Sequence, residues 1–235
     1  MHTSRGGVST PDQSMDPSAP VTIAVFCGSS GGTSPVHKEA AIALAHVFHS
    51  CNIKMVYGGG TGGIMGIVSN TLVSLSGTNA VHGVIPLPLM EFEQRFQEGR
   101  DGDAAGRSLE NGDYGVITKV QTMHERKAMM AKEVMEGGPG SGFVALSGGW
   151  GTLEEIMEMA TWNQLGIHDK GLALYNVDGY YNGLIRWVEE AVSAGFVSPA
   201  NKEILAIASE PQEVVRKLRD YKLSPGRMSL NWAHK

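Results

Sequence analysis

The sequence has little cysteine, no excess of positive charge and no long apolar run. Only Cys27 and Cys51 are present, without a CxxC motif, so a disulfide scaffold or a structural zinc site is not expected. Lys and Arg number 19 against 24 Asp and Glu, a net charge of −5, which argues against nucleic acid as a partner. No apolar stretch reaches the ~18 residues of a membrane span. We therefore predict an intracellular, cytoplasmic protein that binds neither nucleic acid nor membrane.

Glycine, by contrast, is abundant. The 235 residues include 31 glycines, about 13%, where soluble proteins average roughly 7%. No G-X-Y period runs through the chain, which excludes collagen, and a hydrophobic content of 42% is typical of a folded domain. Sixteen of these glycines fall in four clusters, within residues 28–32, 58–66, 137–142 and 148–151. Their positions, rather than the overall composition, point to a function.

Short apolar runs alternate with stretches of helical periodicity, which is the pattern of a parallel sheet with crossover helices. Strands are predicted at residues 21–26, 53–57, 80–85, 143–146, 171–175 and 204–208. Helices are predicted at about 35–51, 62–76, 121–136, 151–165, 180–195 and 211–222. Six strands with interleaved helices make a single doubly wound α/β domain, with helices on both faces of the sheet, over residues 21–223.

Four segments lie outside this pattern. Residues 1–20 contain three prolines and no apolar core of a leader peptide, so we predict a disordered tail. Residues 224–235 form a second tail with no evident role. Residues 98–112 and 137–142 look like flexible surface loops, and the first is long enough to cover an active site.

Three of the four glycine clusters directly follow a predicted strand and lead towards a helix. In an open α/β sheet such turns line the carboxyl edge, where helix N-termini offer unpaired N–H groups to a phosphate. Glycine also makes tight turns for steric reasons alone, but three clusters at one edge favour an anion site. Gly28, Ser29, Gly59 and Gly60 are candidates for its phosphate-binding loops.

Three familiar motifs are incomplete or absent. The run from Gly58 to Gly63 fits GxGxxG, but the next strand ends without the acidic residue that would hold an adenosine ribose, which weakens NAD binding. The run from Gly28 to Gly32 fits GxSxG, but no acid and histidine that complete a triad can be identified. No GxxxxGK[ST] is present, so a Walker-type nucleotide triphosphatase is not indicated.

The strongest local signal is SGGWGTLEE, residues 147–155, between a buried strand and an amphipathic helix. In one interpretation Thr152 is the N-cap of that helix, and Glu155 reaches back to the Thr152 N–H in a capping box. In the other, the three glycines let the backbone approach a phosphate beside the Thr152 hydroxyl, and Glu155 faces the sugar. The two interpretations compete for the same carboxylate.

A second group of functional candidates is MHERK, residues 123–127, at the start of the preceding helix. Met123, Arg126 or Lys127, and Met130 recur at helical spacing, so one face combines methionine with a cation. Such a face could be an ordinary amphipathic one, with solvated basic residues and methionine in the core. An arginine near the glycine-rich edge would instead suit bidentate contact with a phosphate or carboxylate.

Together these motifs resemble the lonely-guy family of cytokinin riboside 5′-monophosphate phosphoribohydrolases, long labelled lysine-decarboxylase-like. The similar segments run in order from about residue 21 to 222: CGSS, VYGGGTGGIMG, MHERKAMMAKE, SGGWGTLEE and ATWNQLGIHDKGLALYNVDGYYNGLI. Ser147 stands where the family pattern PGGxGTxxE has proline. The GGPGSG segment at 137–142 looks like an insertion, and the loop at 98–112 is enlarged.

The resemblance implies a Rossmann-like fold, a homodimer or a higher oligomer built from dimers, and no metal or organic cofactor. It also implies hydrolysis of an N6-substituted adenosine 5′-monophosphate to the free base and ribose 5-phosphate. The family's catalytic pair falls on Arg126 and Glu155. Its substrate contacts fall on Glu93, Lys127, Gly149, Trp150, Gly151, Thr152, Leu153, Glu154 and Thr161.

This chemistry suits the residues. Breaking an N-glycosidic bond develops positive charge on the ribose, so a carboxylate near the sugar, here Glu155, stabilises that charge or activates water. Arg126 would orient the substrate by holding either the departing base or the phosphate. Decarboxylation of lysine would need pyridoxal phosphate on a Schiff-base lysine, a context that Lys127 lacks. The alternative is a module that binds a nucleoside phosphate without cleaving it, and only the enzyme would need Glu155.

Overall fold

The computed structural model describes residues 18–98, 112–230 and 232. Most of the predicted tail at 1–20, and of the predicted loop at 98–112, lies outside the described residues. The strands are β1 (Thr22–Phe26), β2 (Lys54–Tyr57), β3 (Val81–Pro86), β4 (Val116–Val120), β5 (Gly142–Ala145), β6 (Gly171–Tyr175) and β7 (Leu205–Ala208). The α-helices are α1 (Val36–Ser50), α2 (Gly63–Ser76), α3 (Leu87–Glu98), α4 (Met123–Glu136), α5 (Trp150–Leu165), α6 (Asn182–Ser193) and α7 (Pro211–Arg219).

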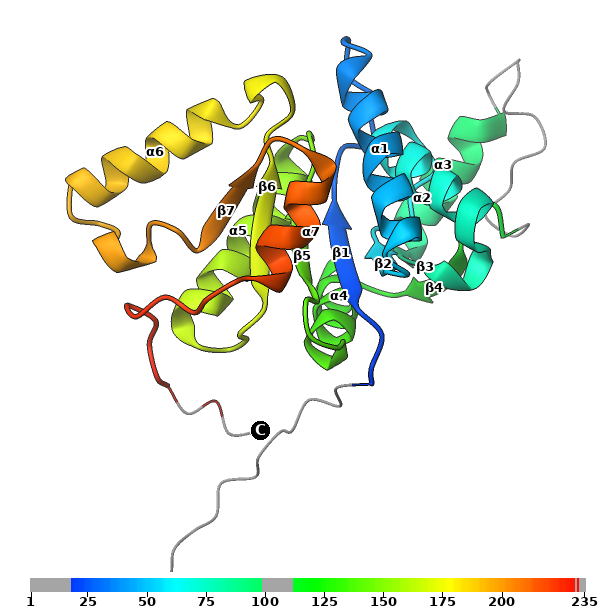
Figure 1. Ribbon diagram of the computed structural model, residues 1–235. Coiled ribbons are helices and arrows are strands. Elements are labelled where there is room, and N and C mark those ends of the chain that lie inside the picture. Colours follow the sequence, from blue (N-terminus) through cyan, green and yellow to red (C-terminus); the bar gives the residue numbers. More distant parts are fainter. Residues whose placement is uncertain (1–17, 99–111, 231, 233–235) are drawn as a thin grey trace, which may run out of the picture.

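The described strands form one parallel sheet in the order β4-β3-β2-β1-β5-β6-β7. From β1 the chain steps outward through β2 and β3 to β4, and then crosses back to place β5 on the other side of β1 (Figure 1). The direction of strand addition therefore reverses between β1 and β5. In doubly wound sheets the crevice at such a switch point is where ligands bind. The predicted fold class is confirmed.

Strand β1 shows how the sequence divides the core into two layers. Ile23 and Val25 face α1, α2 and α7, whereas Ala24 and Phe26 face α4 and α5. Alternate side chains of a strand point to opposite faces, so a run that is apolar at every position needs helices on both sides. Each fully buried large apolar side chain in these layers contributes roughly 1.5–3 kcal/mol.

Two elements, β4 and α3, are missing from the predicted set. Strand β4 lies at the edge of the sheet, where Thr118 is only half-buried and Lys119 is exposed, so its sequence lacks the apolar run of a central strand. Helix α3 begins with Leu87 and Pro88. Proline is tolerated there because the first turn of a helix leaves its backbone N–H groups unpaired in any case.

The GGPGSG segment, residues 137–142, is a turn held by hydrogen bonds to residues at or just before the start of β1. Gly138 N donates to Pro20 O over 3.0 Å, and Ser141 Oγ accepts a hydrogen bond of 2.9 Å from Thr22 N. Gly137, Gly138 and Ser141 are buried, and Gly142 already belongs to β5. The prediction of a flexible surface loop at 137–142 is therefore wrong, because the turn ties the start of β1 to the end of α4.

The chain after α7 returns along the C-terminal end of α5 (Figure 1). Met228 N donates to Gln164 O over 2.8 Å, and the indole Nε1 of Trp232 donates to Leu165 O over 2.9 Å. The described part of the predicted C-terminal tail is thus docked on the domain.

Candidate active site

A pocket of about 360 Å³ opens at the carboxyl edge of the sheet, beside the switch point between β1 and β5. The glycine-rich loops that follow β1, β2 and β5 meet there, as the order of motifs predicts. Of the predicted site residues, the pocket brings together Gly28, Ser29, Gly60, Glu93, Arg126, Gly149, Trp150, Gly151, Thr152 and Glu155.

Five predicted residues do not line this pocket. Gly59 lies beneath it with a φ of +74°, and a Cβ atom there would come within 2.8 Å of Ile85. Leu153 is partly buried and packs against the core between the sheet and α5. Thr161 is exposed further along α5, where its hydroxyl donates to Met157 O. The remaining two, Lys127 and Glu154, bind each other on the outer side of the contact between α4 and α5.

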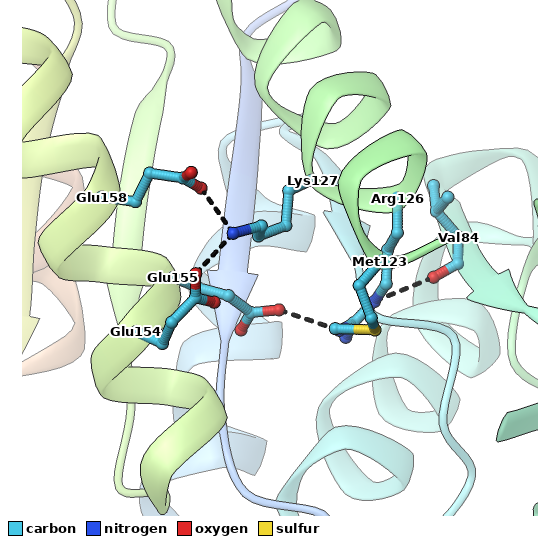
Figure 2. Close-up of polar contacts among 7 residues, drawn as sticks. All are labelled: Val84, Met123, Arg126, Lys127, Glu154, Glu155 and Glu158. Atoms are coloured by element: carbon cyan, nitrogen blue, oxygen red, sulfur yellow. Dashed lines mark hydrogen bonds and ion pairs between the residues drawn. The ribbon is translucent and has the colours of Figure 1, made fainter.

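Arg126 and Glu155 form an ion pair across the floor of the pocket. Arg126 Nη1 lies 3.0 Å from Glu155 Oε1, and the two side chains are only 10% and 6% exposed. Arg126 Nε also donates to Val84 O over 3.2 Å, which fixes the guanidinium against β3. Figure 2 shows the two side chains reaching towards each other from α4 and α5. The predicted catalytic residues are therefore in direct contact.

The start of α4 explains why Arg126 is held in place. Thr122 is the N-cap, and its hydroxyl accepts a hydrogen bond of 3.1 Å from Glu125 N. Glu125 Oε2 in turn accepts a hydrogen bond of 2.7 Å from Gln121 N. Such a reciprocal arrangement satisfies backbone donors that a helix start leaves unpaired. The first turn of α4 is thus stabilised at the residue before Arg126.

The capping box predicted at Thr152 is not formed. Helix α5 begins at Trp150 with Gly149 as its N-cap, and Leu153 N donates to Gly149 O over 3.1 Å, so Thr152 already lies inside the helix. The carboxylate of Glu155 is paired with Arg126 instead. The capping-box interpretation is therefore wrong, and Glu155 lines the pocket.

Glycines around the pocket fall into two groups. A Cβ atom at Gly58 would lie 1.7 Å from Arg126 Nη2, and one at Gly148 would lie 2.0 Å from Thr152 Oγ1, so these two glycines are required for internal packing. At Gly149 and Gly151 an added Cβ would meet nothing within 4 Å. The protein itself gives no packing reason for glycine at these two positions, which leave the N-terminus of α5 open for a ligand.

Burial dominates the electrostatics of Glu155. It raises the pKa of this carboxyl above its ordinary value, and the charge of Arg126 opposes that rise without cancelling it. Burial likewise raises the pKa of the neighbouring Cys27 thiol, which stays neutral. In the described part of the chain Glu155 Oε1 has no hydrogen bond of regular geometry. A buried carboxylate with spare capacity is suited to a ligand hydroxyl or a water molecule.

Lys127, the neighbour of Arg126, faces away from the pocket. It is bonded to Glu154 and lies 3.0 Å from Glu158 Oε2 (Figure 2). Burial alone would lower the pKa of Lys127, but its hydrogen bonds to the two carboxylates outweigh burial and raise that pKa. The amine is therefore held protonated, whereas a Schiff-base lysine must be able to lose its proton.

Glu93, the remaining predicted contact, lies on α3 at the pocket wall. Its Oε2 accepts a hydrogen bond of 2.7 Å from the Thr61 hydroxyl, which joins α3 to the loop after β2. The sequence motifs did not point to the apolar part of the lining, which comprises Met65, Ile85, Leu89 and Phe92. For Leu89 and Phe92 the available signal is the amphipathic pattern of α3, which places them with Glu93 on one side of a helix, whereas Met65 comes from α2 and Ile85 from β3.

Two further chemistries find no support among the described residues. No group of three or more His, Cys, Asp or Glu side chains is placed to hold a metal ion. In the described part of the chain Ser30, the serine of the GxSxG run, is bonded to Gly32 N, and the nearby His37 is bonded to Ser147 instead, so no serine–histidine pair is formed at Ser30. In addition, no described helix is long and apolar enough to cross a membrane.

A parallel doubly wound sheet, with glycine-rich loops around a charged pocket at its switch point, defines a ligand-binding α/β protein of the Rossmann type. Two solved structures share the fold. A molybdenum cofactor binding protein from Rippkaea orientalis is 16% identical with a TM-score of 0.52, covering 84% of this chain and 94% of that one. A molybdenum cofactor carrier protein from Chlamydomonas reinhardtii is 15% identical, also with a TM-score of 0.52, covering 85% of this chain and 96% of that one.

The sequence comparisons are more specific. The family model described as possible lysine decarboxylase matches residues 65–218, and the chain belongs to this family. The cytokinin riboside 5′-monophosphate phosphoribohydrolase LOG1 of Arabidopsis thaliana is 43% identical over 199 residues, covering 85% of this chain and 83% of that protein. A bifunctional cytokinin biosynthesis protein of Fusarium pseudograminearum is 49% identical over 199 residues. This chain is matched over 85% of its length but spans only 40% of that relative.

Proposed function

We propose that this protein hydrolyses the N-glycosidic bond of cytokinin riboside 5′-monophosphates. Water and an N6-substituted adenosine 5′-monophosphate would give the free base and ribose 5-phosphate. The observation that carries the proposal is the buried pair of Arg126 and Glu155, which lines the same pocket as the open N-terminus of α5. The names of the relatives of comparable length, such as the Arabidopsis protein, describe this activity.

The N-terminus of α5 is the proposed phosphate site. Backbone N–H groups at a helix start are unpaired and lie at the positive end of the helix dipole, so they attract an anion. Gly149 and Gly151 contribute no side chain at this end, an added Cβ at either would meet only open space, and Thr152 lies at the pocket wall. Binding a phosphate here would supply binding energy remote from the reacting carbon.

Glu155 is then the group that acts at the sugar. As the C–N bond breaks, the bonding electrons leave with the base and the ribose becomes oxocarbenium-like, so a carboxylate beside the ribose stabilises the developing charge or accepts a proton from the attacking water. Arg126 keeps Glu155 oriented and offers its remaining donors to the substrate. Glu93, Lys127, Leu153, Glu154 and Thr161 remain predicted substrate contacts.

The apolar half of the pocket suits the base and its N6 substituent. Leu89, Phe92 and Met123 line it and are exposed at its mouth, and Trp150 beside them is 90% exposed. Exposed apolar patches of this kind mark interaction sites. They support the proposed homodimer, in which a second subunit would lie close to the pocket. The cytoplasmic location also remains a prediction.

The decisive experiment incubates the purified chain with isopentenyladenosine 5′-monophosphate and separates the products by chromatography. We expect isopentenyladenine and ribose 5-phosphate in equal amounts. Glu155→Gln should bind the nucleotide in calorimetry but release base at least about a hundredfold more slowly, while Arg186→Ala, a change on α6 away from the pocket, should behave like the wild type. If the wild type binds nucleoside monophosphates yet releases base from none of them, the protein is the non-catalytic binding module instead.

A further inference from the structure

The loop between β5 and α5 is tied to a distant part of the chain through Ser147. The hydroxyl of this buried serine is hydrogen-bonded over 2.9 Å to Nδ1 of His37, which is 110 residues away on α1. The carbonyl oxygen of Ser147 accepts a second hydrogen bond, of 3.0 Å, from Gly28 N in the loop after β1. Ser147 therefore joins three segments that meet at the switch point of the sheet.

The residues on either side of Ser147 are held as well. Tyr181 Oη donates to Leu146 O, and Tyr180 Oη donates to Gly148 O. Both tyrosines come from the short connection between β6 and α6, so this support is independent of α1. Three consecutive residues of the loop are thus each held by a side chain from elsewhere in the fold.

The support of this loop matters because the loop leads directly into the start of α5. Gly148 and Gly149 come immediately after Ser147, and glycine backbones lose more freedom on becoming ordered than any others. The N–H groups of Gly149 and of the first turn of α5 form the proposed phosphate site, and Gly148 leads directly into it. If the loop were not held in advance, substrate binding would have to order it. The lost conformational entropy would then make the free energy of binding less favourable.

His37 also contacts Tyr180 edge-on, with ring centroids 5.5 Å apart. Together they line a second pocket, of about 380 Å³, which shares Gly28, Ser29 and Gly149 with the candidate active site. The supported loop is therefore the wall between the two pockets. A shift of His37 would be passed to this wall, while Arg126 and Glu155 line only the pocket on its other side.

We propose that His37, acting through the Ser147 hydroxyl, is a positioning residue that holds the phosphate-binding end of α5 ready for the substrate. This inference rests on the proposed function, because that function assigns the phosphate to Gly149 and Gly151. Ser147 stands where the family pattern has proline, whose ring restricts the backbone by itself. In this chain a hydrogen bond from a distant helix supplies the restriction.

The test is a double-mutant cycle with His37→Ala, Ser147→Ala and the combination of both. Each single variant should raise KM for isopentenyladenosine 5′-monophosphate about threefold to tenfold, the loss of one net hydrogen bond, while kcat stays near the wild-type value. The double variant should be no worse than either single one, because both remove the same interaction. His46→Ala, an exposed change on α1, should leave KM unchanged.

Two further measurements separate positioning from general damage. Ser147→Pro should restore a near-wild-type KM in the His37→Ala background. Hydrogen exchange of the amides of residues 148–152, measured without substrate, should be faster in His37→Ala than in the wild type. It should be slow again in the variant that combines His37→Ala with Ser147→Pro, whose residue 147 has no amide hydrogen. Should Ser147→Pro fail to fold, the alanine cycle and the exchange data decide the question without it.

The proposal is overturned if His37→Ala changes neither KM nor the exchange of residues 148–152. It is equally overturned if His37→Ala has its full effect on KM in the Ser147→Ala background. If the wild type hydrolyses no nucleotide, the proposed function fails, whereas the exchange measurement still reports whether His37 holds the loop.

Discussion

Two neighbouring cations of α4 meet two neighbouring carboxylates of α5 in different surroundings. Arg126 and Glu155 point inward and are almost fully buried, whereas Lys127 and Glu154 point outward, with Glu154 52% exposed (Figure 2). Successive helix residues are about 100° apart, so a single step along each helix moves a charge from the pocket to the outer surface. The same two helices therefore carry an inner pair and an outer cluster, the latter completed by Glu158.

The difference shows what each set of charges is for. Taking Arg126 and Glu155 out of water carries a desolvation cost that their attraction barely offsets, so stability alone does not explain a buried pair. Its place at a pocket beside an open helix N-terminus gives the functional explanation. In the outer cluster Lys127 is itself only 12% exposed, but Glu154 and Glu158 are 52% and 27% exposed. Ion pairs whose carboxylates reach solvent add about 1 kcal/mol or less to folding stability.

The inner pair should show its largest effect in catalysis. Glu155→Gln should lower kcat for isopentenyladenosine 5′-monophosphate by about 10²- to 10⁴-fold, because it removes the group that acts at the sugar. Glu158→Gln makes the same chemical change one turn further along α5, on the outer side, and should lower kcat by less than about threefold. Steady-state kinetics on both variants checks this. Equal losses would show that the inner pair has no special role.

The second-largest expected effect is that of Arg126→Ala on folding stability. Arg126→Ala leaves Glu155 buried without its partner, which should lower the free energy of unfolding at pH 7 by about 3 kcal/mol. Without Arg126 the pKa of Glu155 rises further. Below that pKa the carboxyl is neutral, and its burial without a partner is tolerated. The loss of stability relative to the wild type therefore grows as the pH rises through that pKa. Urea unfolding at pH 5 and pH 8 measures this.

Adding Glu155→Gln to Arg126→Ala should recover part of the stability at pH 8, because the unpaired charge is gone. A double variant that is less stable than Arg126→Ala alone would contradict the description of Glu155 as a buried charge dependent on its partner.

The pH dependence of activity gives a smaller effect with a defined sign. Glu155 acts in its ionised form, so activity falls as pH falls through its pKa, which burial raises above the ordinary value of 4.5. The acid limb of kcat/KM should therefore have its midpoint above pH 4.5. The charge of Lys127 lowers the pKa of Glu155 and that of Glu154 raises it. Lys127→Ala should move the midpoint up and Glu154→Gln should move it down.

The smallest effect is the contribution of the outer cluster to folding. Lys127→Ala should change the free energy of unfolding by about 1 kcal/mol or less, since its partners are partly exposed and screened. Raising the salt concentration should reduce this difference further. Urea unfolding at low and high salt is the measurement, and a loss comparable to that of Arg126→Ala would remove the distinction between inner and outer charges.

The central part of the fold could be predicted from the sequence because its strands are buried on both faces. Strand β1 is continuously apolar after Thr22, so its position follows from hydrophobicity and its type from the shortness of the run. Strand β4 lies at the edge of the sheet, where half-buried Thr118 and exposed Lys119 remove that signal. The order of glycine clusters also correctly located the carboxyl edge, because a cluster that follows a parallel strand must lie there.

Details of the site were harder because they depend on how helices are rotated and where they begin. The pattern T-x-x-E occurs at both Thr122 and Thr152, yet only Thr122 is an N-cap, since α5 already begins after Gly149. Likewise, periodicity could not decide whether Arg126 or Lys127 faces the pocket. That choice is made by packing of Arg126 against Gly58 and β3.

The hydrogen bond between Ser147 and His37 joins residues 110 positions apart, and the candidate active-site pocket is lined mainly by loop and helix residues spread from Cys27 to Glu155. No single fragment of the chain contains this site. Contacts of such long range form slowly, because chain closure must occur before they stabilise anything. A nucleotide that binds only the finished pocket stabilises the native state as a whole, so its presence should raise the midpoint of global unfolding and report on the completed fold.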